Sequence, residues 1–261
     1  MHFITITSDW SKQDFYIGAL EGSILSTCPE VTIIHLSHSV KPYNTAEAGF
    51  IVRNASPKFP AGTIHLMAVN TQPAPDCQHL LAKVEDQYFI SADNGFLGLL
   101  GDPEPEEVFR LPVPSERSSA SFPVLDIMVP AACSLVQGKK PAEIGAPVKD
   151  YNKQIPLRAT LENDTITGTV IYIDSYGNAI TNISSELFHR IGQSRPFEIY
   201  VQSKHYKIDT LNTHYAETTA GDLLALFNSV GLLEVAIRNG SASGLLNLNT
   251  GSTIRIEFKK K

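Results

Sequence analysis

The chain opens with His2-Phe3-Ile4-Thr5-Ile6-Thr7-Ser8-Asp9-Trp10, in which apolar and polar residues alternate before a carboxylate and an aromatic ring. Alternation with a period of two is typical of a β-strand. The next residues favour a helix over 12–27, because apolar residues recur at helical spacing from Phe15 onward and Pro29 stops the pattern. An apolar run over 31–36 predicts a second strand. This order of strand, helix and strand indicates an α/β fold.

The same alternation continues through the first half of the chain. Asn44 is expected to cap a helix that ends before Pro57, and a further helix is expected over 126–136, where Pro130 is tolerated in the first turns. More strands are expected at 63–69, 88–92 and 107–111. Strands that alternate with helices predict an α/β domain over residues 1–145, with a Rossmann-like, largely parallel layered sheet.

The second half has a different pattern. Residues 146–159 lack periodicity and contain Pro147 and Pro156, which indicates a linker. Short strands separated by turns then predict an all-β barrel domain over residues 160–261. The expected strands lie at 165–173, 197–201, 205–208, 223–227, 233–237 and 253–258.

Composition excludes several classes of protein. The 261 residues are 43% hydrophobic and 18% charged with a net charge of −6, and the basic residues are dispersed apart from Lys259-Lys260-Lys261. A nucleic-acid partner is therefore not expected. No run of 18 apolar residues and no leader pattern occur, so we expect no membrane association and a cytoplasmic location. The three cysteines, Cys28, Cys77 and Cys133, fit neither a disulfide framework nor a metal site.

A candidate ligand loop lies in Ile171-Tyr172-Ile173-Asp174-Ser175-Tyr176-Gly177-Asn178, which is closed by Thr181-Asn182-Ile183. Glycine permits a sharp turn, so Asp174, Tyr176 and Asn178 can converge on a small volume. A carboxylate, a ring and an amide suit a nucleoside-like ligand. The same residues are equally consistent with a hairpin turn that is stabilised by the Asp174 side chain.

Polar residues also follow the predicted strands of the first domain. Asp9 follows the first strand, where ligands bind in open α/β sheets, and either a ribose contact or a helix cap would explain it. Asp14 is better explained as a helix cap, because Ser11 and Asp14 have capping-box spacing. His35 and His38 end the second strand, and polar groups satisfied at a strand end explain them better than a metal pair.

Two further turns are informative. Asp93-Asn94-Gly95 has the chemistry of a structural turn. Asn228-Ser229 follows an apolar strand, and its hydroxyl and amides suit either a ligand carboxylate or ammonium group or a plain hairpin turn. The chain contains no GxGxxG, P-loop or GxSxG motif, which leaves nicotinamide, nucleoside-triphosphate and α/β-hydrolase chemistry without support.

Taken in order, these segments resemble the S-adenosylmethionine hydroxide adenosyltransferases, whose halogenating relatives are the fluorinases and chlorinases. The resemblance covers nearly the whole chain, and it rests on seven matches in the same order. These are Ser8-Asp9 with Asp14-Phe15-Tyr16-Ile17-Gly18, His35-Leu36-Ser37-His38 with Pro42, Phe59-Pro60-Ala61-Gly62-Thr63, Ala92-Asp93-Asn94-Gly95, Asp126 with Pro130-Ala131-Ala132, Asp174 to Asn178 with Thr181-Asn182, and Asn228-Ser229 with Leu233-Glu234.

The resemblance implies an α/β domain, a β-barrel domain and a homotrimer that binds S-adenosylmethionine between the first domain of one subunit and the second domain of the next. It implies no further cofactor and no metal. Asp9 would hold the ribose diol. The other implied contacts are Tyr43, Phe59 and Phe122 to the sugar and sulfonium, Asp174 and Ser229 to the methionine ammonium and carboxylate, and Tyr176, Asn178 and, more weakly, Tyr215 to the adenine.

The chain departs from the family at the residues that activate water. Where the family has aspartate and arginine after the third strand, this chain has Asn70 and the segment 71–77 without arginine. The family motif Phe-His-Gly-Arg-Asp is represented by Phe122-Pro123-Val124-Leu125-Asp126, so Pro123 and Leu125 replace histidine and arginine. Asn70 can orient a water but cannot accept its proton.

These departures leave two functions open. One is hydrolysis of S-adenosylmethionine to adenosine and methionine by attack of water at C5′, with His79 or Asp76 as substitutes for the missing base. The other is non-catalytic binding of S-adenosylmethionine or an adenosine compound. Bulk water has a pKa of about 15.7, and losing a positioned base costs on the order of 10²–10⁴ in rate.

Overall fold

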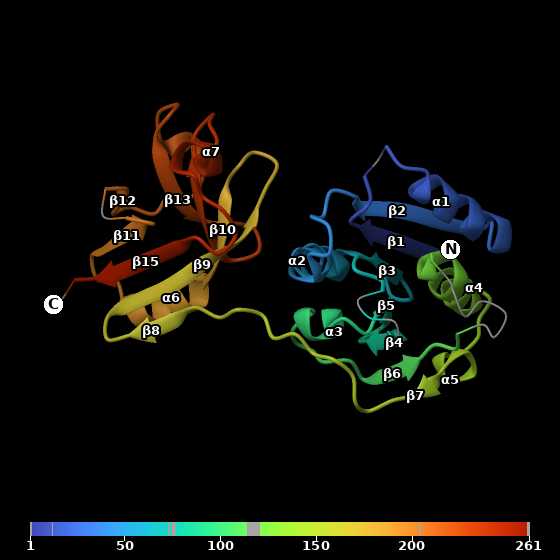
Figure 1. Cartoon of the computed structure of the whole chain (residues 1–261). Helices are drawn as coiled ribbons and strands as arrows, with labels where there is room; N and C mark the ends of the chain where they lie inside the picture. The colour runs from blue at the N-terminus through green and yellow to red at the C-terminus, as the bar shows by residue number, and fades with distance from the viewer. Residues whose placement is uncertain are drawn as a thin grey trace. The chain divides into compact units, whose positions relative to one another are not determined.

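The computed structural model describes residues 2–11, 13–72, 74, 77–113, 121–203 and 205–259, which form two compact units. The first unit spans Met1–Pro156 and the second spans Leu157–Lys261 (Figure 1). The division falls within the segment that the sequence predicts as a linker. Residues up to Gln154 nevertheless contact the first unit, because the Asn152 amide donates to Asp93 and the Gln154 side chain donates to the Asn94 carbonyl.

The N-terminal unit is a mixed sheet with helices on both faces. Its strands run in the order β2-β1-β3-β5-β4-β6-β7, and β1 is parallel to both β2 and β3. β4 and β7 are antiparallel to their neighbours, so the unit is α/β while the Rossmann-like description is not confirmed. The strands are β1 (His2–Ser8), β2 (Val31–Ser37), β3 (Ile64–Ala68), β4 (His79–Val84), β5 (Gln87–Ala92), β6 (Glu107–Arg110) and β7 (Ala146–Pro147).

The helices cover this sheet in two layers. On one face α1 and α4 enclose a core that includes Ile4, Ile6 and Leu66, and on the other face α2 and α3 enclose a core that includes Met67 and Val69 (Figure 1). Alternate residues of β3 therefore enter different cores, which is why this strand is buried along its whole length. The helices are α1 (Tyr16–Thr27), α2 (Thr45–Ala55), α3 (Phe96–Leu99), α4 (Val129–Val136) and α5 (Pro141–Ile144), with a 3₁₀ turn η1 (Ser56–Lys58) and a π-helical turn η3 (Val124–Met128).

Helix boundaries agree with the sequence in one case and differ in two. The Asn44 side chain accepts a hydrogen bond from the Glu47 amide and caps α2, as predicted. α1 begins at Tyr16 after Phe15 and has no side-chain cap, so the prediction that Asp14 caps this helix is wrong. The predicted helix 126–136 is a π turn followed by α4, in which Pro130 occupies the first turn.

The C-terminal unit is β-rich and nearly closes into a barrel. Its strands run in the order β12-β11-β15-β9-β10-β14-β13, with β8 paired to β9, and a bridge from Asn212 to Leu226 draws the two edges together. Two short helices make the unit β-rich where the sequence predicted an all-β domain. The elements are β8 (Thr160–Glu162), β9 (Thr165–Ile173), β10 (Ala179–Ser184), α6 (Ser185–Gly192), β11 (Phe197–Val201), β12 (Lys207–Ile208), the 3₁₀ turn η4 (Tyr215–Glu217), β13 (Leu223–Phe227), β14 (Leu232–Ile237), α7 (Ala242–Leu246) and β15 (Thr253–Phe258).

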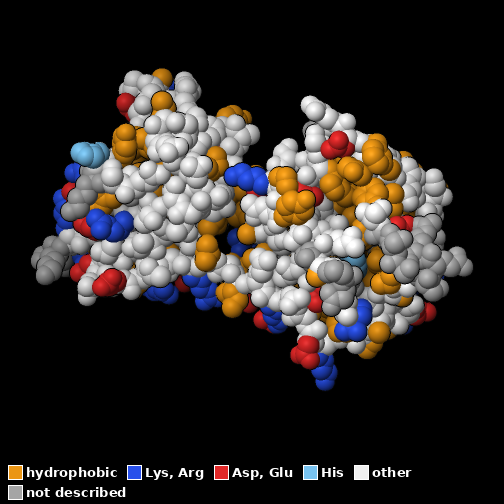
Figure 2. All heavy atoms as spheres, viewed as in Figure 1, with side chains coloured by type: hydrophobic (Ala, Val, Ile, Leu, Met, Phe, Trp, Pro, Cys, Tyr) orange, Lys and Arg blue, Asp and Glu red, His pale blue; other side chains and the backbone are white. Residues whose placement is uncertain are grey.

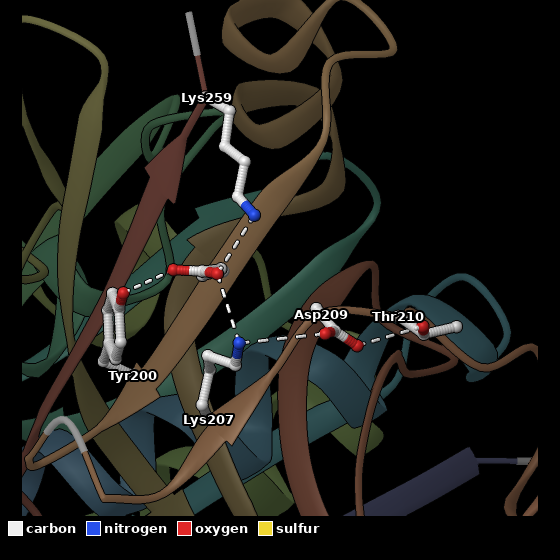
Figure 3. A network of polar contacts seen from close by, with 6 residues as sticks. Tyr200, Lys207, Asp209, Thr210 and Lys259 are labelled. Carbon is white, nitrogen blue, oxygen red and sulfur yellow. Dashed lines mark hydrogen bonds and ion pairs between the residues drawn. The ribbon is translucent and has the colours of Figure 1, made fainter.

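A polar network marks the outward face of β11, β12 and β15 (Figure 3). Glu198 accepts hydrogen bonds from the Tyr200 hydroxyl at 2.5 Å, from Lys259 at 3.1 Å and from Lys207 at 3.2 Å. These three donors lower the pKa of Glu198 to about 2. Exposed ion pairs of this kind contribute little to stability, so we assign the network to the solvated surface.

Candidate functional site

Asp9 joins three loops at the carboxyl edge of the N-terminal sheet. β1, β2 and β3 run parallel, so the loops that follow them emerge together. The Asp9 Oδ2 atom accepts a hydrogen bond from the Tyr43 amide at 2.9 Å and from the Asn70 amide at 3.4 Å. Both donors adopt positive φ angles of 65° and 48°, which turn their amides toward the carboxylate. Asp9 caps no helix, and among the described residues no hydrogen bond to its Oδ1 atom is found.

The loop after β3 is held in place by the predicted turn at residues 93–95. The Asn94 side chain donates to the carbonyls of Val69 and Asn70 at 3.1 and 3.0 Å, and its Oδ1 atom accepts from the Phe96 amide. Gly95 has a φ of 92°, and a Cβ atom there would lie 2.4 Å from the Gln154 side chain. This turn is structural, as predicted, and it fixes the backbone of Asn70.

Aromatic side chains gather beside the Asp9 loop. The ring centroid of Trp10 lies 5.1 Å from that of Phe122 and 5.8 Å from that of Tyr16. The ring centroid of Tyr16 lies 5.2 Å from that of Phe122 and 4.5 Å from that of Phe15. Phe15 is 73% exposed and Tyr43 is 76% exposed. Hydrophobic side chains are grouped on the visible face of the N-terminal unit (Figure 2). An apolar surface next to a carboxylate suits a sugar or a base.

Phe59 is not part of this edge. It follows η1 and precedes β3, so it lies at the amino end of that strand, where it packs edge-on against His65 at 5.8 Å. His65 is buried between Thr5 and Phe89. Opposite ends of a parallel strand separate Phe59 from Asp9, so the structure does not bring these two predicted site residues together within the N-terminal unit.

The positions of the missing activating residues carry no charged or basic side chain. Val124 is completely buried in the core, Leu125 packs against the same core, and Pro123 is the residue before the π turn. Asp76, named as a substitute base, lies outside the described residues.

His79 retains a basic atom near the Asn70 loop. It is 2% exposed, and its Nε2 atom donates to the Thr71 carbonyl at 3.0 Å, so the neutral ring leaves Nδ1 as an acceptor. Nδ1 is buried without a hydrogen-bond partner among the described residues. Burial lowers the pKa of His79 below its ordinary value, which keeps the ring neutral near pH 7.

The two histidines after β2 belong to a hydrogen-bonded chain. His38 contacts the Ser8 hydroxyl at 2.6 Å and His35 at 2.6 Å, and His35 contacts Glu21 of α1 at 3.0 Å. They are polar groups satisfied at a strand end, the interpretation that the sequence favoured. Among the described residues no group of three or more His, Cys, Asp or Glu side chains is arranged to hold a metal ion.

In the C-terminal unit the loop from Asp174 to Asn178 connects β9 and β10. The Asp174 Oδ1 atom accepts from the amides of Tyr176 and Asn178 at 2.9 Å each, and Oδ2 accepts from the Asn178 side chain at 3.0 Å. Gly177 has a φ of 80°, and a Cβ there would lie 2.1 Å from the Ser241 hydroxyl. The Asp174-stabilised turn is present, and it leaves Tyr176 78% exposed while Asn178 is buried.

Glu234 of β14 links two of the other predicted site residues. Its carboxylate accepts from the Tyr215 hydroxyl at 2.6 Å and from the Asn228 side chain at 3.2 Å. Asn228 in turn accepts from the amides of Val230 and Leu232, which shapes the turn that carries Ser229. Glu234 was not predicted from the sequence as a site residue. The sequence did offer one signal for it, since Glu234 is a carboxylate within an otherwise apolar run, Leu233 to Ile237, that is buried in the structure.

Comparison with known proteins agrees with this organisation. Residues 4–145 match the model of the S-adenosylmethionine hydroxide adenosyltransferase N-terminal domain, and residues 168–255 match that of the C-terminal domain. The chain belongs to the S-adenosylmethionine hydroxide adenosyltransferase family. The family resemblance seen in the sequence is thereby confirmed.

Relatives in this family carry two activities by name. The (R)-S-adenosyl-L-methionine hydrolase of Thermus thermophilus is 26% identical over 269 residues, covering 98% of this chain and all of that protein. A fluorinase of Actinopolyspora mzabensis is 23% identical over 97% of this chain and 96% of its own length. An uncharacterised conserved protein from Thermotoga maritima has a similar structure, with a TM-score of 0.86 and 26% identity over 98% of this chain and 99% of its own. The helices of the described part of this chain include none with the length and apolar character needed to cross a membrane.

Proposed function

We propose that this protein binds S-adenosylmethionine and hydrolyses it slowly to adenosine and methionine. The observation that carries the proposal is the Asp9 carboxylate, which is held by two amides at the carboxyl edge of the sheet with Oδ1 free of hydrogen bonds within the described residues. A carboxylate in this place suits the two hydroxyls of a ribose. The family membership, and the hydrolase relatives, support this choice of ligand.

The proposed reaction needs a proton acceptor but no acid. Water attacks C5′ as the C5′–S bond breaks, and the bonding electron pair leaves on the neutral thioether of methionine. The attacking water loses a proton, and we propose His79 as the acceptor because its Nδ1 atom has no hydrogen-bond partner among the described residues. Since that atom is buried, the proposal requires the Asn70 loop to expose it to the water when the ligand binds. Thr71 accepts a hydrogen bond from His79, and the preceding residue, Asn70, donates to Asp9, so one short loop connects the proposed base to the proposed ribose contact.

Slow turnover is expected because the usual set of activating residues is absent. An imidazole can replace the lost carboxylate as the base, but no arginine or second histidine stands at the expected positions. General-base catalysis contributes about 10²–10⁴ in rate, and the loss of positioning adds to the deficit.

A second candidate function is non-catalytic binding of S-adenosylmethionine or an adenosine compound. The replacement of the activating residues by Asn70, Pro123 and Leu125 favours it. The two functions share a ligand, so they differ only in whether adenosine accumulates.

One experiment separates the two functions. Purified protein is incubated with S-adenosylmethionine overnight, and adenosine is measured by chromatography for the wild type, for His79→Asn and for the control His205→Asn, which alters an exposed histidine of the other unit. The proposal predicts adenosine from the wild type and the control, and at least tenfold less from His79→Asn with unchanged affinity. No adenosine above the blank from the wild type would establish the non-catalytic binder. Equal rates for all three proteins would exclude His79 as the base.

The resemblance also leads us to propose a homotrimer in which different subunits supply the two halves of the ligand site. Each unit carries residues that the resemblance assigns to the ligand, Asp9 in the first and Asp174 and Tyr215 in the second, which supports this proposal. Sedimentation equilibrium measures the oligomeric state and tests this proposal.

A further inference from the structure

Glu234 is a buried carboxylate in the middle of an apolar strand. It is 2% exposed, and its neighbours Leu233 and Val235 are completely buried. Among the described residues it forms no ion pair with a lysine, arginine or histidine. Burying a carboxylate costs free energy that an apolar residue of the same size would avoid, so its presence calls for an explanation beyond packing.

Both oxygens of Glu234 are used by side chains from other elements. Oε1 accepts from the hydroxyl of Tyr215 in η4 at 2.6 Å, and Oε2 accepts from the amide of Asn228 after β13 at 3.2 Å. Burial, followed by Glu234 itself and by the more distant Asp174, raises the pKa of Tyr215 above its ordinary value. The phenol therefore remains a hydrogen-bond donor, and its ring is held while 44% of the residue is exposed.

The carboxylate also sets the orientation of the Asn228 amide. Because Glu234 can only accept, the Nδ2 side of Asn228 must face it, and Oδ1 is left to accept from the amides of Val230 and Leu232 at 3.2 and 3.1 Å. These bonds close the tight turn in which Ser229 is presented. One carboxylate thus fixes both an exposed aromatic ring and a polar turn.

We propose that Glu234 is the positioning residue of the ligand site in the C-terminal unit. It holds the Tyr215 ring and the Ser229 turn at a fixed separation, so that one ligand contacts a ring at its base end and a hydroxyl and amides at its amino-acid end. The inference rests on the proposed function, because the ligand is S-adenosylmethionine. Glu234 acts through Tyr215 and Asn228 and does not contact the reacting atoms.

Two substitutions separate positioning from packing. Glu234→Leu keeps the volume and removes both acceptors. It removes the cost of a buried carboxylate but leaves the Asn228 amide and the Tyr215 hydroxyl without this partner, so the two effects on stability oppose each other. Glu234→Gln can keep both contacts if its oxygen accepts from Asn228 and its amide donates to the Tyr215 oxygen. The opposite orientation of the glutamine amide would place its NH₂ group against the NH₂ group of Asn228. In Glu234→Gln the phenol therefore becomes an acceptor, which favours phenolate and lowers the pKa of Tyr215.

The experiment measures three quantities for the wild type, Glu234→Leu, Glu234→Gln and the control Glu186→Leu, which changes an 86% exposed side chain on α6. These are the affinity for S-adenosylmethionine by calorimetry, stability in urea, and the ionisation of Tyr215 by NMR of ¹³C-labelled tyrosine, assigned with Tyr215→Phe. We expect Glu234→Leu to bind at least about tenfold more weakly while it remains folded in the absence of urea. Glu234→Gln should bind within about threefold of the wild type and show a lowered Tyr215 pKa, and the control should be unchanged.

Wild-type affinity in Glu234→Leu would overturn the proposal. Equal losses of affinity in Glu234→Leu and Glu234→Gln would also overturn it, because they would indicate that only the charge of Glu234 matters. If the wild type binds neither S-adenosylmethionine nor adenosine, the proposed function fails. The tyrosine titration then still decides whether Glu234 controls Tyr215, because it needs no ligand. An unchanged Tyr215 pKa in both variants would refute that control.

Discussion

Acid should destabilise the N-terminal unit through His65. This residue is 1% exposed, and its ring stacks on that of Phe89 with 4.7 Å between the centroids. Nδ1 accepts a hydrogen bond from the Thr5 hydroxyl at 2.7 Å, and Nε2 donates to the Gln87 side chain at 3.2 Å. Desolvation lowers its pKa from 6.5 to about 4, against a smaller opposing effect of the Gln87 hydrogen bond. The folded state therefore holds the neutral ring.

The sign and size of the effect follow from proton linkage. Between pH 6.5 and about 4 the unfolded chain binds a proton at His65 that the folded chain does not, so the free energy of unfolding decreases as pH falls through this window. Each pH unit inside the window is worth about 1.4 kcal/mol, which gives a loss of about 2 kcal/mol between pH 7 and pH 5. His79, whose pKa burial also lowers, contributes with the same sign.

Trp10 makes this prediction measurable, because it is the single tryptophan and it lies in the N-terminal unit. Urea unfolding is followed by its fluorescence at pH 7 and pH 5, for the wild type and for His65→Gln. The variant removes the titrating ring, so it should lose about 2 kcal/mol less than the wild type over the same interval. Equal stability of the wild type at the two pH values, or an undiminished loss in His65→Gln, would refute the reasoning.

Three other predictions concern the ligand site. Asp174→Ala should weaken binding of S-adenosylmethionine by more than about 1 kcal/mol, since a hydrogen bond to a charged partner is lost; calorimetry that returns unchanged affinity would remove Asp174 from the site. Asn70→Asp alone should raise the rate of adenosine formation by less than about tenfold, because the arginine and histidine partners are still missing; a gain of 10² or more by chromatography would mean that the carboxylate alone suffices. Sedimentation equilibrium should give the mass of a trimer of 28.5 kDa chains, and a stable monomer would contradict the shared ligand site.

Local patterns predicted the parts of the fold that local chemistry determines. The alternation in residues 2–8, the Asn44 cap and the Asp93-Asn94-Gly95 turn all appear in the structure, because each depends on residues within a few positions of one another. β4 was missed, and the turn between it and β5 uses Glu85 at a φ of 50° where glycine or asparagine would have marked a hairpin. α6 was also missed, although Ser184 caps it, since its short amphipathic stretch lies between strands.

The candidate site was only partly predictable for a related reason. Asp9 could be selected because the end of a parallel strand is a recurrent ligand position, but its bonds to Tyr43 and Asn70 span 34 and 61 residues. The separation of Phe59 from Asp9 could not be predicted, because a motif match does not say at which end of a strand a residue lies. Glu234 was overlooked because its partner Tyr215 is 19 residues away and no local pattern pairs them.

The central claim is that the protein binds S-adenosylmethionine through the Asp9 carboxylate and the loops of the C-terminal unit. Calorimetric titration of the wild type and of Asp9→Asn with S-adenosylmethionine tests it most directly. The account predicts saturable binding by the wild type and at least tenfold weaker binding by Asp9→Asn, with adenosine competing for the same site. A wild type that takes up no S-adenosylmethionine, or an Asp9→Asn variant with full affinity, would contradict it.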